Sequence, residues 1–452
     1  MLREAPVCTS MTSSKSDRIH AEQPQNLSIR CAVTDVFVRD IPVSVVFFYE
    51  HSLDSQMLAR GLSQVLGDFA LFNARLRRDG LERFIDCGET GCRFTVHRST
   101  RTLAETLTNL DEGARLQLVD PIAARQVWNR DEPVLSLRVT HFADGCSALG
   151  LSWHHTVGDW HSVMSMLKAW SRAVVGLDYE KPLLVTDRDA HFNSTLPASE
   201  LAPPNLRFMA LRELPKLGLY MLTGARDKRR VTFHFEPDEL ERMRSELERE
   251  AGHKLSINDA LSGHIATVLA ARDVKACDRR LSIAVNFRKR AGLPDHLMCN
   301  AVSTLDVGCE QGKSAASIAA DLRGALDAYA DKHLNHRANL RLIERHGGIA
   351  NITRFIPTGI DPFKGSIVLS NWSRFGIYDI DFGGQPPSHF LTVGGGPLPW
   401  LGTVHEGFGN RGLIVDLEVP TKVAQRVVDE TGLRQLHRYR EGNAASRFRW
   451  LN

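Results

Sequence analysis

The stretch LSWHHTVGDWHSV, residues 151–163, joins an apolar run to a segment with helical spacing, and carries three histidines and an aspartate at the junction. Ahead of the junction, LSLRVTHF (residues 135–142) alternates apolar and polar residues, and CSALGLSW (146–153) follows after the turn ADG, which predicts a β-hairpin. Behind it, apolar residues recur on one helical face, at Val163, Met166, Leu167, Trp170 and Val174. The stretch therefore predicts a strand ending at the histidines and a helix beginning just after them, with this stripe packed in the core.

Two kinds of chemistry fit such a junction. A histidine at the end of a buried strand has a fixed backbone, and an imidazole with a pKa of about 6.5 suits general-base catalysis at neutral pH. Neighbouring strand residues point to opposite faces, so only one of His154 and His155 can face a shared cleft. The alternative is a metal site made of His155, Asp159 and His161, because two histidines and a carboxylate can hold iron or zinc. The facial-triad pattern usually begins His-x-Asp, whereas here the aspartate comes before His161, so we expect no metal.

Length, composition and charge limit the class of protein. A chain of 452 residues is long enough for two domains, and its 43% hydrophobic and 24% charged residues are typical of soluble globular proteins. A net charge of only +3 argues against nucleic acid as the main partner. No apolar run approaches the roughly 20 residues of a membrane-spanning helix, so we expect no membrane partner. The eight cysteines are scattered, which predicts a reducing, cytoplasmic location.

The pattern along the chain divides it into four parts. Residues 1–26 are polar and rich in turn formers, which predicts a disordered tail. Residues 27–180 begin with strand-like sequence over 27–50 and form the N-terminal unit. Residues 181–225 are rich in Pro, Asp, Asn and Ser without a sustained period, which predicts a crossover linker. Residues 226–452 form the C-terminal unit, in which strands are expected at 229–235 and 281–287, a charged surface helix at 236–252, and an apolar helix at 255–272 capped by Ser256 and Asp259.

Four segments, taken in chain order, resemble the BAHD acyl-CoA-dependent acyltransferases of the chloramphenicol acetyltransferase-like superfamily. HHTVGDW (154–160) is similar to that family's HHxxxDG motif, and SNWSRFGIYDIDFGGQPP (370–387) is similar to a Trp-containing strand that leads into DFGWG. VNFRKRAGLPDHLMCNAV (285–302) resembles its strand with an arginine before a Cys-Asn turn, and LARGLSQVLGDFALFNARLRR (58–78) resembles its first-helix segment. The resemblance implies a mixed α/β fold of two chloramphenicol acetyltransferase-like subdomains with a channel between them. It also implies that part of 360–400 crosses to the N-terminal subdomain.

The resemblance also implies a role for each matching residue. His155 is implied as the general base, while we expect His154 to point away from the cleft and His161 to lie on a helix surface. Asp159 and Arg288 are implied as a structural ion pair. The further matches are structural roles for Asn300 and Asp381 and oxyanion stabilisation by Ser370 and Trp372.

The chain departs from the family pattern at two places. Trp160 stands where the family has the Gly of HHxxxDG, and Gly384 and Gln385 replace the Trp-Gly of DFGWG. Two orientations of the Trp160 indole beside the base stay open: it faces the channel and shapes the acceptor pocket, or it packs in the core. We therefore list Trp160 as an acceptor-pocket candidate and expect a divergent branch of the family.

The implied reaction moves an acyl group from acyl-CoA to a hydroxyl or amine of a small-molecule acceptor, a specialised metabolite. Thioester acyl transfer needs a base for the attacking group and a donor for the oxyanion. The sequence lacks a nucleophile signature such as G-x-S-x-G, which favours direct transfer over an acyl-enzyme. We expect a monomer that uses acyl-CoA as co-substrate and holds no permanent cofactor. The alternatives are an acyl-carrier protein as thioester donor, as in condensation-like enzymes, and a catalytically inactive binding homologue.

Overall fold

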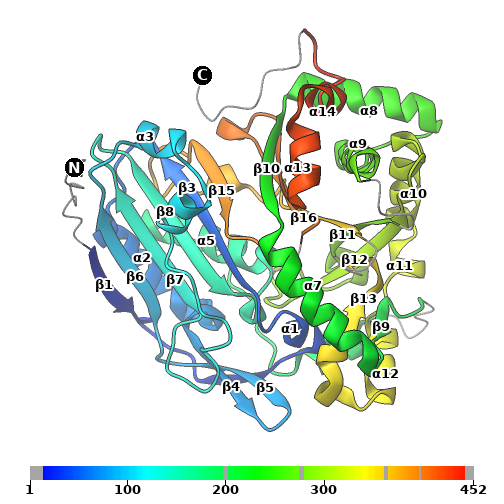
Figure 1. Ribbon diagram of the computed structural model, residues 1–452. Helices are drawn as coiled ribbons and strands as arrows, with labels where there is room; N and C mark the ends of the chain where they lie inside the picture. The colour runs from blue at the N-terminus through cyan, green and yellow to red at the C-terminus, as the bar shows by residue number, and fades with distance from the viewer. Residues whose placement is uncertain (1–13, 197–201, 274–278, 361–364, 397–398, 443–452) are drawn as a thin grey trace, which may run out of the picture.

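Two six-stranded β-sheets lie side by side, each with helices packed against it (Figure 1). The computed structural model describes residues 14–196, 202–273, 279–360, 365–396 and 399–442. The two large hydrophobic cores follow this division, one under the N-terminal sheet and one under the C-terminal sheet. The chain therefore has the mixed α/β architecture with two subdomains that the sequence predicted. No helix in the described ranges is both long enough and apolar enough to cross a lipid bilayer.

The N-terminal sheet has the strand order β1-β6-β7-β8-β3-β15. Its strands are β1 (Ser14–Ile19), β3 (Pro42–Tyr49), β6 (Cys92–Arg98), β7 (Leu135–His141), β8 (Ser147–His154) and β15 (His389–Val393). β7 and β8 form the predicted antiparallel hairpin. β15 pairs antiparallel with β3, so a segment within 360–400 completes the sheet of the N-terminal subdomain.

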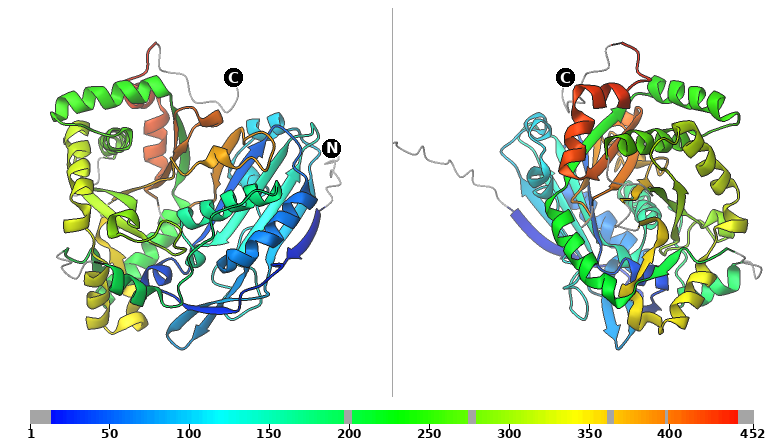
Figure 2. Two further views of the ribbon diagram at one scale, coloured as in Figure 1. Left: turned by 180° about the vertical axis from the view of Figure 1, so that it is seen from behind. Right: turned by 45° about the vertical axis from the view of Figure 1, so that its right-hand side comes forward.

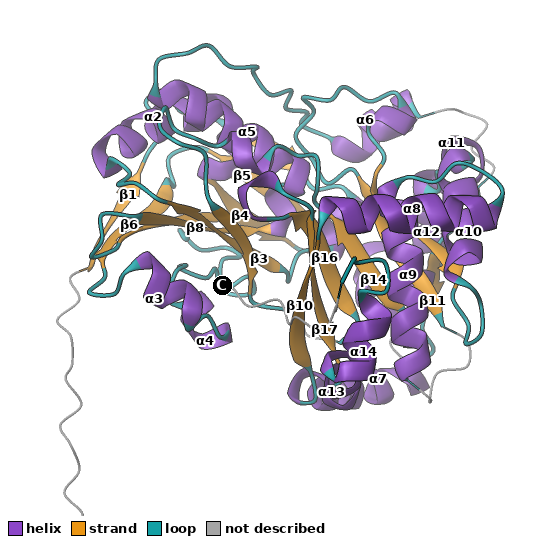
Figure 3. Ribbon diagram, turned by 90° about the horizontal axis from the view of Figure 1, so that it is seen from above, coloured by secondary structure: helices purple, strands orange, loops and turns teal. Residues whose placement is uncertain are grey.

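Helices cover both faces of this sheet (Figure 3). α2 (Ser55–Asp68) and α5 (Trp160–Val174) pack together on one face, as the view from behind also shows (Figure 2, left). The short α3 (Leu103–Thr108) and α4 (Glu112–Leu116) lie on the other face. On α5 the predicted stripe is buried except for Val174, which is half-buried. This packing fixes the start of α5, and with it the turn that carries His155.

The C-terminal sheet has the order β10-β17-β16-β14-β11-β12. Its strands are β10 (Arg229–Phe235), β11 (Arg280–Asn286), β12 (Val302–Gly308), β14 (Ile367–Asn371), β16 (Leu401–Glu406) and β17 (Leu413–Val419). The helices of this part of the chain are α8 (Pro237–Ala251), α9 (Ile257–Arg272), α10 (Ala315–Asp327), α11 (Tyr329–Lys332), α13 (Thr421–Val428) and α14 (Glu430–Leu436). α12 (His336–Arg345) instead contributes Ile343 to the core of the N-terminal subdomain. α9 begins with the predicted capping box, in which the Asp259 N–H donates to Ser256 Oγ at 3.2 Å.

Three regions differ from the sequence prediction. Residues 1–26 were predicted to be disordered, but Ser14–Ile19 forms β1 and pairs with β6; its side chains are almost all exposed, so backbone hydrogen bonds hold it rather than an apolar pattern. Residues 1–13 lie outside the described residues. Strand-like residues 27–50 contain a helical turn, α1 (Val33–Phe37), between β2 (Leu27–Arg30) and β3. β2 belongs to a small sheet with β4 (Ala74–Asp79) and β5 (Glu82–Cys87).

The linker predicted at 181–225 is the third region. It contains α6 (Arg188–Thr195), β9 (Leu206–Phe208), which pairs with β13 (Phe355–Pro357), and α7 (Leu214–Arg226). α7 carries exposed leucines, among them Leu219 and Leu222. The sequence shows no sustained period over this stretch, so it did not predict these elements within the linker.

Candidate active site

His155 stands at the end of β8, as the first residue of the 3₁₀ turn η2 (His155–Val157). Its Nδ1 lies 3.0 Å from Asn300 Oδ1, which belongs to the turn before β12 in the other subdomain. The Asn300 amide nitrogen is already used, because it donates to Asp35 Oδ1 at 2.8 Å and to the His155 carbonyl at 2.9 Å. Asn300 Oδ1 is therefore an acceptor, and the neutral imidazole carries its proton on Nδ1. This tautomer leaves the Nε2 lone pair free to take a proton.

A buried charged pair orients Asn300. Asp35 on α1 is fully buried and lies 2.8 Å from Arg188 Nη1, whose side chain is 1% exposed. Arg188 also donates to the Met298 carbonyl at 3.2 Å. Burial lowers the pKa of Arg188, but the Asp35 carboxylate outweighs it, so that pKa stays above its ordinary value. A continuous chain of contacts thus runs from Arg188 through Asp35 and Asn300 to the imidazole.

Sequence reasoning missed Asp35 and Arg188. Neither belongs to a motif with a recognisable spacing, and they are 153 residues apart. The available signal was a single aspartate within the apolar stretch at 31–38. A charged residue in such a stretch needs a partner if it is buried, but the sequence does not say which one.

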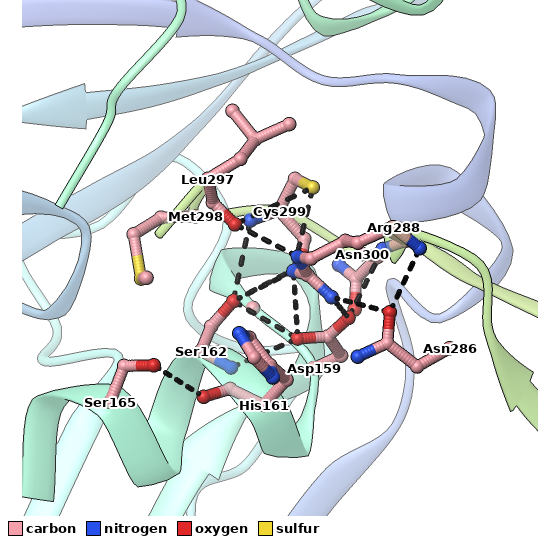
Figure 4. A network of polar contacts seen from close by, with 12 residues as sticks. Asp159, His161, Ser162, Ser165, Asn286, Arg288, Leu297, Met298, Cys299 and Asn300 are labelled. Carbon is pink, nitrogen blue, oxygen red and sulfur yellow. Dashed lines mark hydrogen bonds and ion pairs between the residues drawn. The ribbon is translucent and has the colours of Figure 1, made fainter. Parts of the chain in front are cut away.

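Asp159 and Arg288 form a buried, two-pronged ion pair (Figure 4). Arg288 Nη1 lies 2.7 Å from Asp159 Oδ2 and Nη2 lies 3.1 Å from Oδ1, with side-chain exposures of 1% and 2%. Asp159 also caps α5, because it accepts from the Ser162 N–H at 3.0 Å, and it accepts from the Ala301 N–H at 3.1 Å. Burial raises the pKa of Asp159, but Arg288 outweighs burial and holds that pKa below its ordinary value. The pair therefore ties the turn after His155 to the loop that carries Asn300.

The neighbouring histidines have other partners. His154 is fully buried on the opposite side, where Nε2 lies 3.2 Å from the Ala124 carbonyl, and burial lowers its pKa to about 4. His161 Nε2 lies 2.7 Å from the Asp295 carbonyl. Because Asp159 is occupied by Arg288 and the histidines contact separate partners, these residues do not converge on a common point. Within the described residues, no group of three or more His, Cys, Asp or Glu side chains is arranged to hold a metal ion.

Trp160 packs in the core. It is 6% exposed and stacks on Trp372, with ring centroids 4.5 Å apart at 17°, and on Trp153 at 5.8 Å. It does not line the cavity that contains His155. The acceptor-pocket assignment of Trp160 is therefore corrected: the indole continues an aromatic stack between β8 and the segment after β14.

Ser370 and Trp372 are coupled to each other. The Trp372 indole N–H donates to Ser370 Oγ at 2.8 Å. The Trp372 N–H is therefore already used, and the Ser370 hydroxyl is the group of this pair that can donate a hydrogen bond to a ligand. Asp381 lies elsewhere, where it accepts from Ser171 Oγ on α5 at 3.2 Å and from the Gly383 N–H at 3.0 Å. These contacts hold the DFG turn against α5.

The cysteine nearest to this network is buried and poorly suited to act as a nucleophile. Cys299 is fully buried beside Arg288, and burial raises the pKa of its thiol to about 12. The thiolate, which is the reactive form, is therefore scarcely populated at neutral pH. Cys299 therefore offers no readily formed thiolate beside His155.

Two cavities lie near the seam between the subdomains. His155 and Asn300 line one of about 330 Å³, together with residues of α1, β12 and α12. The other, of about 740 Å³, has a mixed polar and apolar wall that includes Lys168, Arg374 and the first residues of α8 and α9. The first can hold an apolar compound against the imidazole. The second combines two cationic side chains and two helix N-termini, which favour anions, with the carboxylates of Asp379 and Glu406.

Known proteins are similar to this chain over most of its length. Residues 9–393 match the family model described as Transferase family. Vinorine synthase of Rauvolfia serpentina is 24% identical over 85% of this chain and 88% of its own length. Shikimate O-hydroxycinnamoyltransferase of Nicotiana tabacum is 25% identical over 83% of this chain and 88% of its own length.

Solved structures show the same fold. The crystal structure of vinorine synthase has a TM-score of 0.68 at 20% identity and covers 92% of this chain and 96% of its own. The crystal structure of F. graminearum TRI101 complexed with coenzyme A and deoxynivalenol has a TM-score of 0.69 at 16% identity. The match covers 90% of this chain and 98% of the TRI101 chain. A condensation domain from the Monacolin K polyketide synthase MokA has a TM-score of 0.60 at 13% identity, covering 94% and 99%.

Proposed function

The chain belongs to the Transferase family of BAHD acyltransferases, and we propose that it moves an acyl group from acyl-CoA directly to a hydroxyl or amine of a small-molecule acceptor, with His155 as the general base. The observation that carries the proposal is the Asn300 contact, which fixes the proton of the neutral imidazole on Nδ1 and leaves Nε2 basic. His155 also lines a cavity in which an acceptor can bind.

The proposed reaction is a direct displacement. The acceptor O–H lies against Nε2 of His155, and the imidazole takes its proton as the oxygen attacks the thioester carbonyl. The tetrahedral intermediate carries a negative oxygen, for which the free Ser370 hydroxyl is the candidate donor, with the Trp372 N–H holding its oxygen in place. The intermediate collapses to the ester, and the protonated imidazole returns the proton to the departing thiolate of CoA. Each atom is then accounted for without an acyl-enzyme, which fits the raised pKa of Cys299.

The polar cleft is the proposed entry of the donor. Acyl-CoA carries several phosphate charges, and the cleft offers Lys168, Arg374 and the N-termini of α8 and α9. Asp379 and Glu406 also line it, and Asp379 lies 3.9 Å from Lys168, so Arg374 is the cation that this proposal assigns to phosphate. Backbone N–H groups at helix N-termini and nearby cationic side chains are a common means of binding phosphate. In the part of its wall that the structure describes, the apolar cavity beside His155 has no Lys or Arg, which supports opposite approaches for donor and acceptor.

Product analysis tests this proposal. The purified protein is incubated with pooled acyl-CoAs and a panel of alcohols and amines, and products are identified by mass spectrometry, with free CoA thiol measured in parallel. We expect one ester or amide to accumulate in equal amount to the released CoA. A donor comparison with an acyl-carrier protein loaded with the same acyl group decides the source of the thioester. Transfer only from the carrier would contradict the acyl-CoA assignment, and no transfer from either donor would contradict the enzyme assignment.

A further inference from the structure

The described wall of the cavity beside His155 has two titratable side chains that can carry a positive charge, the imidazoles of His155 and His336. Among the described residues that form its wall there is no aspartate, glutamate, lysine or arginine. Much of the wall is aliphatic or aromatic, as at Val33, Phe37, Val38, Phe287, Leu340 and Ile360. The nearby charged residues are already paired, since Asp35 meets Arg188 at 2.8 Å and Asp189 accepts from the Val33 N–H at 3.1 Å. The second imidazole, His336, places Nε2 3.4 Å from Asp189.

A neutral polar patch interrupts the apolar wall. Asn339 Nδ2 donates to Asn205 Oδ1 at 2.8 Å, and the Asn205 N–H donates back to Asn339 Oδ1 at 3.1 Å. Asn205 Nδ2 donates to the Thr304 carbonyl at 2.9 Å. These amides are held in fixed positions by one another. Asn339 Nδ2 also donates to Asn335 Oδ1 at 3.3 Å and Asn205 Nδ2 to Thr304 Oγ1 at 3.2 Å, so the Thr304 hydroxyl is the group of the patch that can donate to a neutral polar atom of a ligand.

The spacing along the chain sets the distance between this patch and the base. Asn300 contacts His155, and Thr304, four residues further along the same extended segment, contacts Asn205. At about 3.3 Å per extended residue, four residues span about 13 Å between Cα atoms, which places the patch on the order of 10 Å from the imidazole. A compound that spans the cavity therefore meets the base at one end and neutral amides at the other.

The geometry points to a class of acceptor: a neutral, mostly apolar alcohol with one uncharged hydrogen-bonding group on the order of 10 Å from its reacting hydroxyl. This inference rests on the proposed function. Among the described wall residues, a carboxylate or an ammonium group would lose its water without gaining an Asp, Glu, Lys or Arg partner of opposite charge, and burial of an unpaired charge is strongly unfavourable. The cavity of about 330 Å³ lies at the small end of the range for ligand sites, which fits one acceptor of modest size.

A matched series of alcohols tests the inference. Methyl 8-hydroxyoctanoate, 8-hydroxyoctanoate and 8-amino-1-octanol share a chain and a primary hydroxyl but end in a neutral ester, a carboxylate and an ammonium group. At pH 7 we expect kcat/KM for O-acylation of the ester to exceed that of either charged analogue by at least about tenfold. Leu340→Lys, which adds a cation to the cavity, should reduce this preference over the carboxylate by about tenfold or more, whereas Leu340→Met, matched in length but neutral, should retain it.

Binding measured separately keeps this inference distinct from the proposed reaction. The three alcohols are titrated into His155→Ala by calorimetry without acyl-CoA. Tighter binding of the ester, together with no acylation of it by the wild type, would support the acceptor class and contradict the proposed function. Turnover of a charged analogue as fast as the ester would overturn the acceptor class and leave the proposed function intact.

Discussion

The ion pair between Asp159 and Arg288 allows a quantitative prediction. Breaking a fully buried pair by removing one partner costs about 3–5 kcal/mol of unfolding free energy, because the remaining charge is left uncompensated. Both side chains are almost fully buried here. Asp159→Ala also removes the N-cap of α5, which contributes about 0.5–2 kcal/mol. We therefore expect Asp159→Ala to lower the unfolding free energy by roughly 4–6 kcal/mol, and Arg288→Met by about 3–5 kcal/mol.

The double variant isolates the pairing. When both charges are removed together no unpaired charge remains, so Asp159→Ala/Arg288→Met should be about 2–3 kcal/mol more stable than the sum of the single effects predicts. Urea unfolding followed by tryptophan fluorescence suits the measurement, because Trp153, Trp160 and Trp372 stack just beyond Asp159. Since the pKa of Asp159 is lowered in the folded state, its stabilisation is present above about pH 4 and is lost as the pH falls through the folded pKa. Strictly additive losses would refute the pairing argument.

Three further predictions follow from other contacts. Asn300→Leu removes the acceptor that fixes the His155 tautomer, so kcat should fall about tenfold with KM for acyl-CoA unchanged in steady-state assays; an unaltered kcat would remove the proposed role of that contact. Burial keeps His154 neutral in the folded protein, with a pKa of about 4. Between about pH 6.5 and 4 the unfolded chain therefore binds one proton more at this residue than the folded protein does. As the pH falls across that window, this residue alone lowers the free energy of unfolding by roughly 3 kcal/mol. His154→Leu should flatten the dependence of unfolding free energy on pH by that one proton, and an identical slope in the variant would contradict the assignment. Trp160→Gly should cost about 3–5 kcal/mol in thermal or urea unfolding while acceptor preference stays the same; normal stability with a changed acceptor range would place the indole in the channel after all.

Much of the fold could be predicted where burial leaves a period in the sequence. The β7–β8 hairpin, the α5 stripe and the α9 capping box each follow from residues close together in the chain. β1 could not be found in this way, because its side chains are mostly exposed and only backbone pairing with β6 holds it. The pairing of β15 with β3 joins residues more than 300 positions apart, such as His389 and Phe48, for which a single sequence carries no local signal.

The candidate site could also be predicted only in part from the sequence. The position of His155 at the end of a strand followed from the pattern, whereas the pairing of Asp159 with Arg288 came from the family resemblance. Neither the sequence pattern nor the family resemblance identified Asp35 and Arg188, because a buried charge does not identify its distant partner. The orientation of Trp160 could not be decided either, since an indole at the start of a helix can turn to a channel or to the core, and only its stack on Trp372 distinguishes them.

The most direct test of the central claim is the turnover number of His155→Ala beside that of His154→Ala. Each variant is first shown by circular dichroism and urea unfolding to be folded, and each is then assayed under saturating acyl-CoA and acceptor. If His155 is the general base, its removal should lower kcat by roughly 10²–10⁴-fold, and removal of the buried His154 should affect stability far more than kcat. Near-normal kcat in a folded His155→Ala protein, or equal losses at the two positions, would contradict the account.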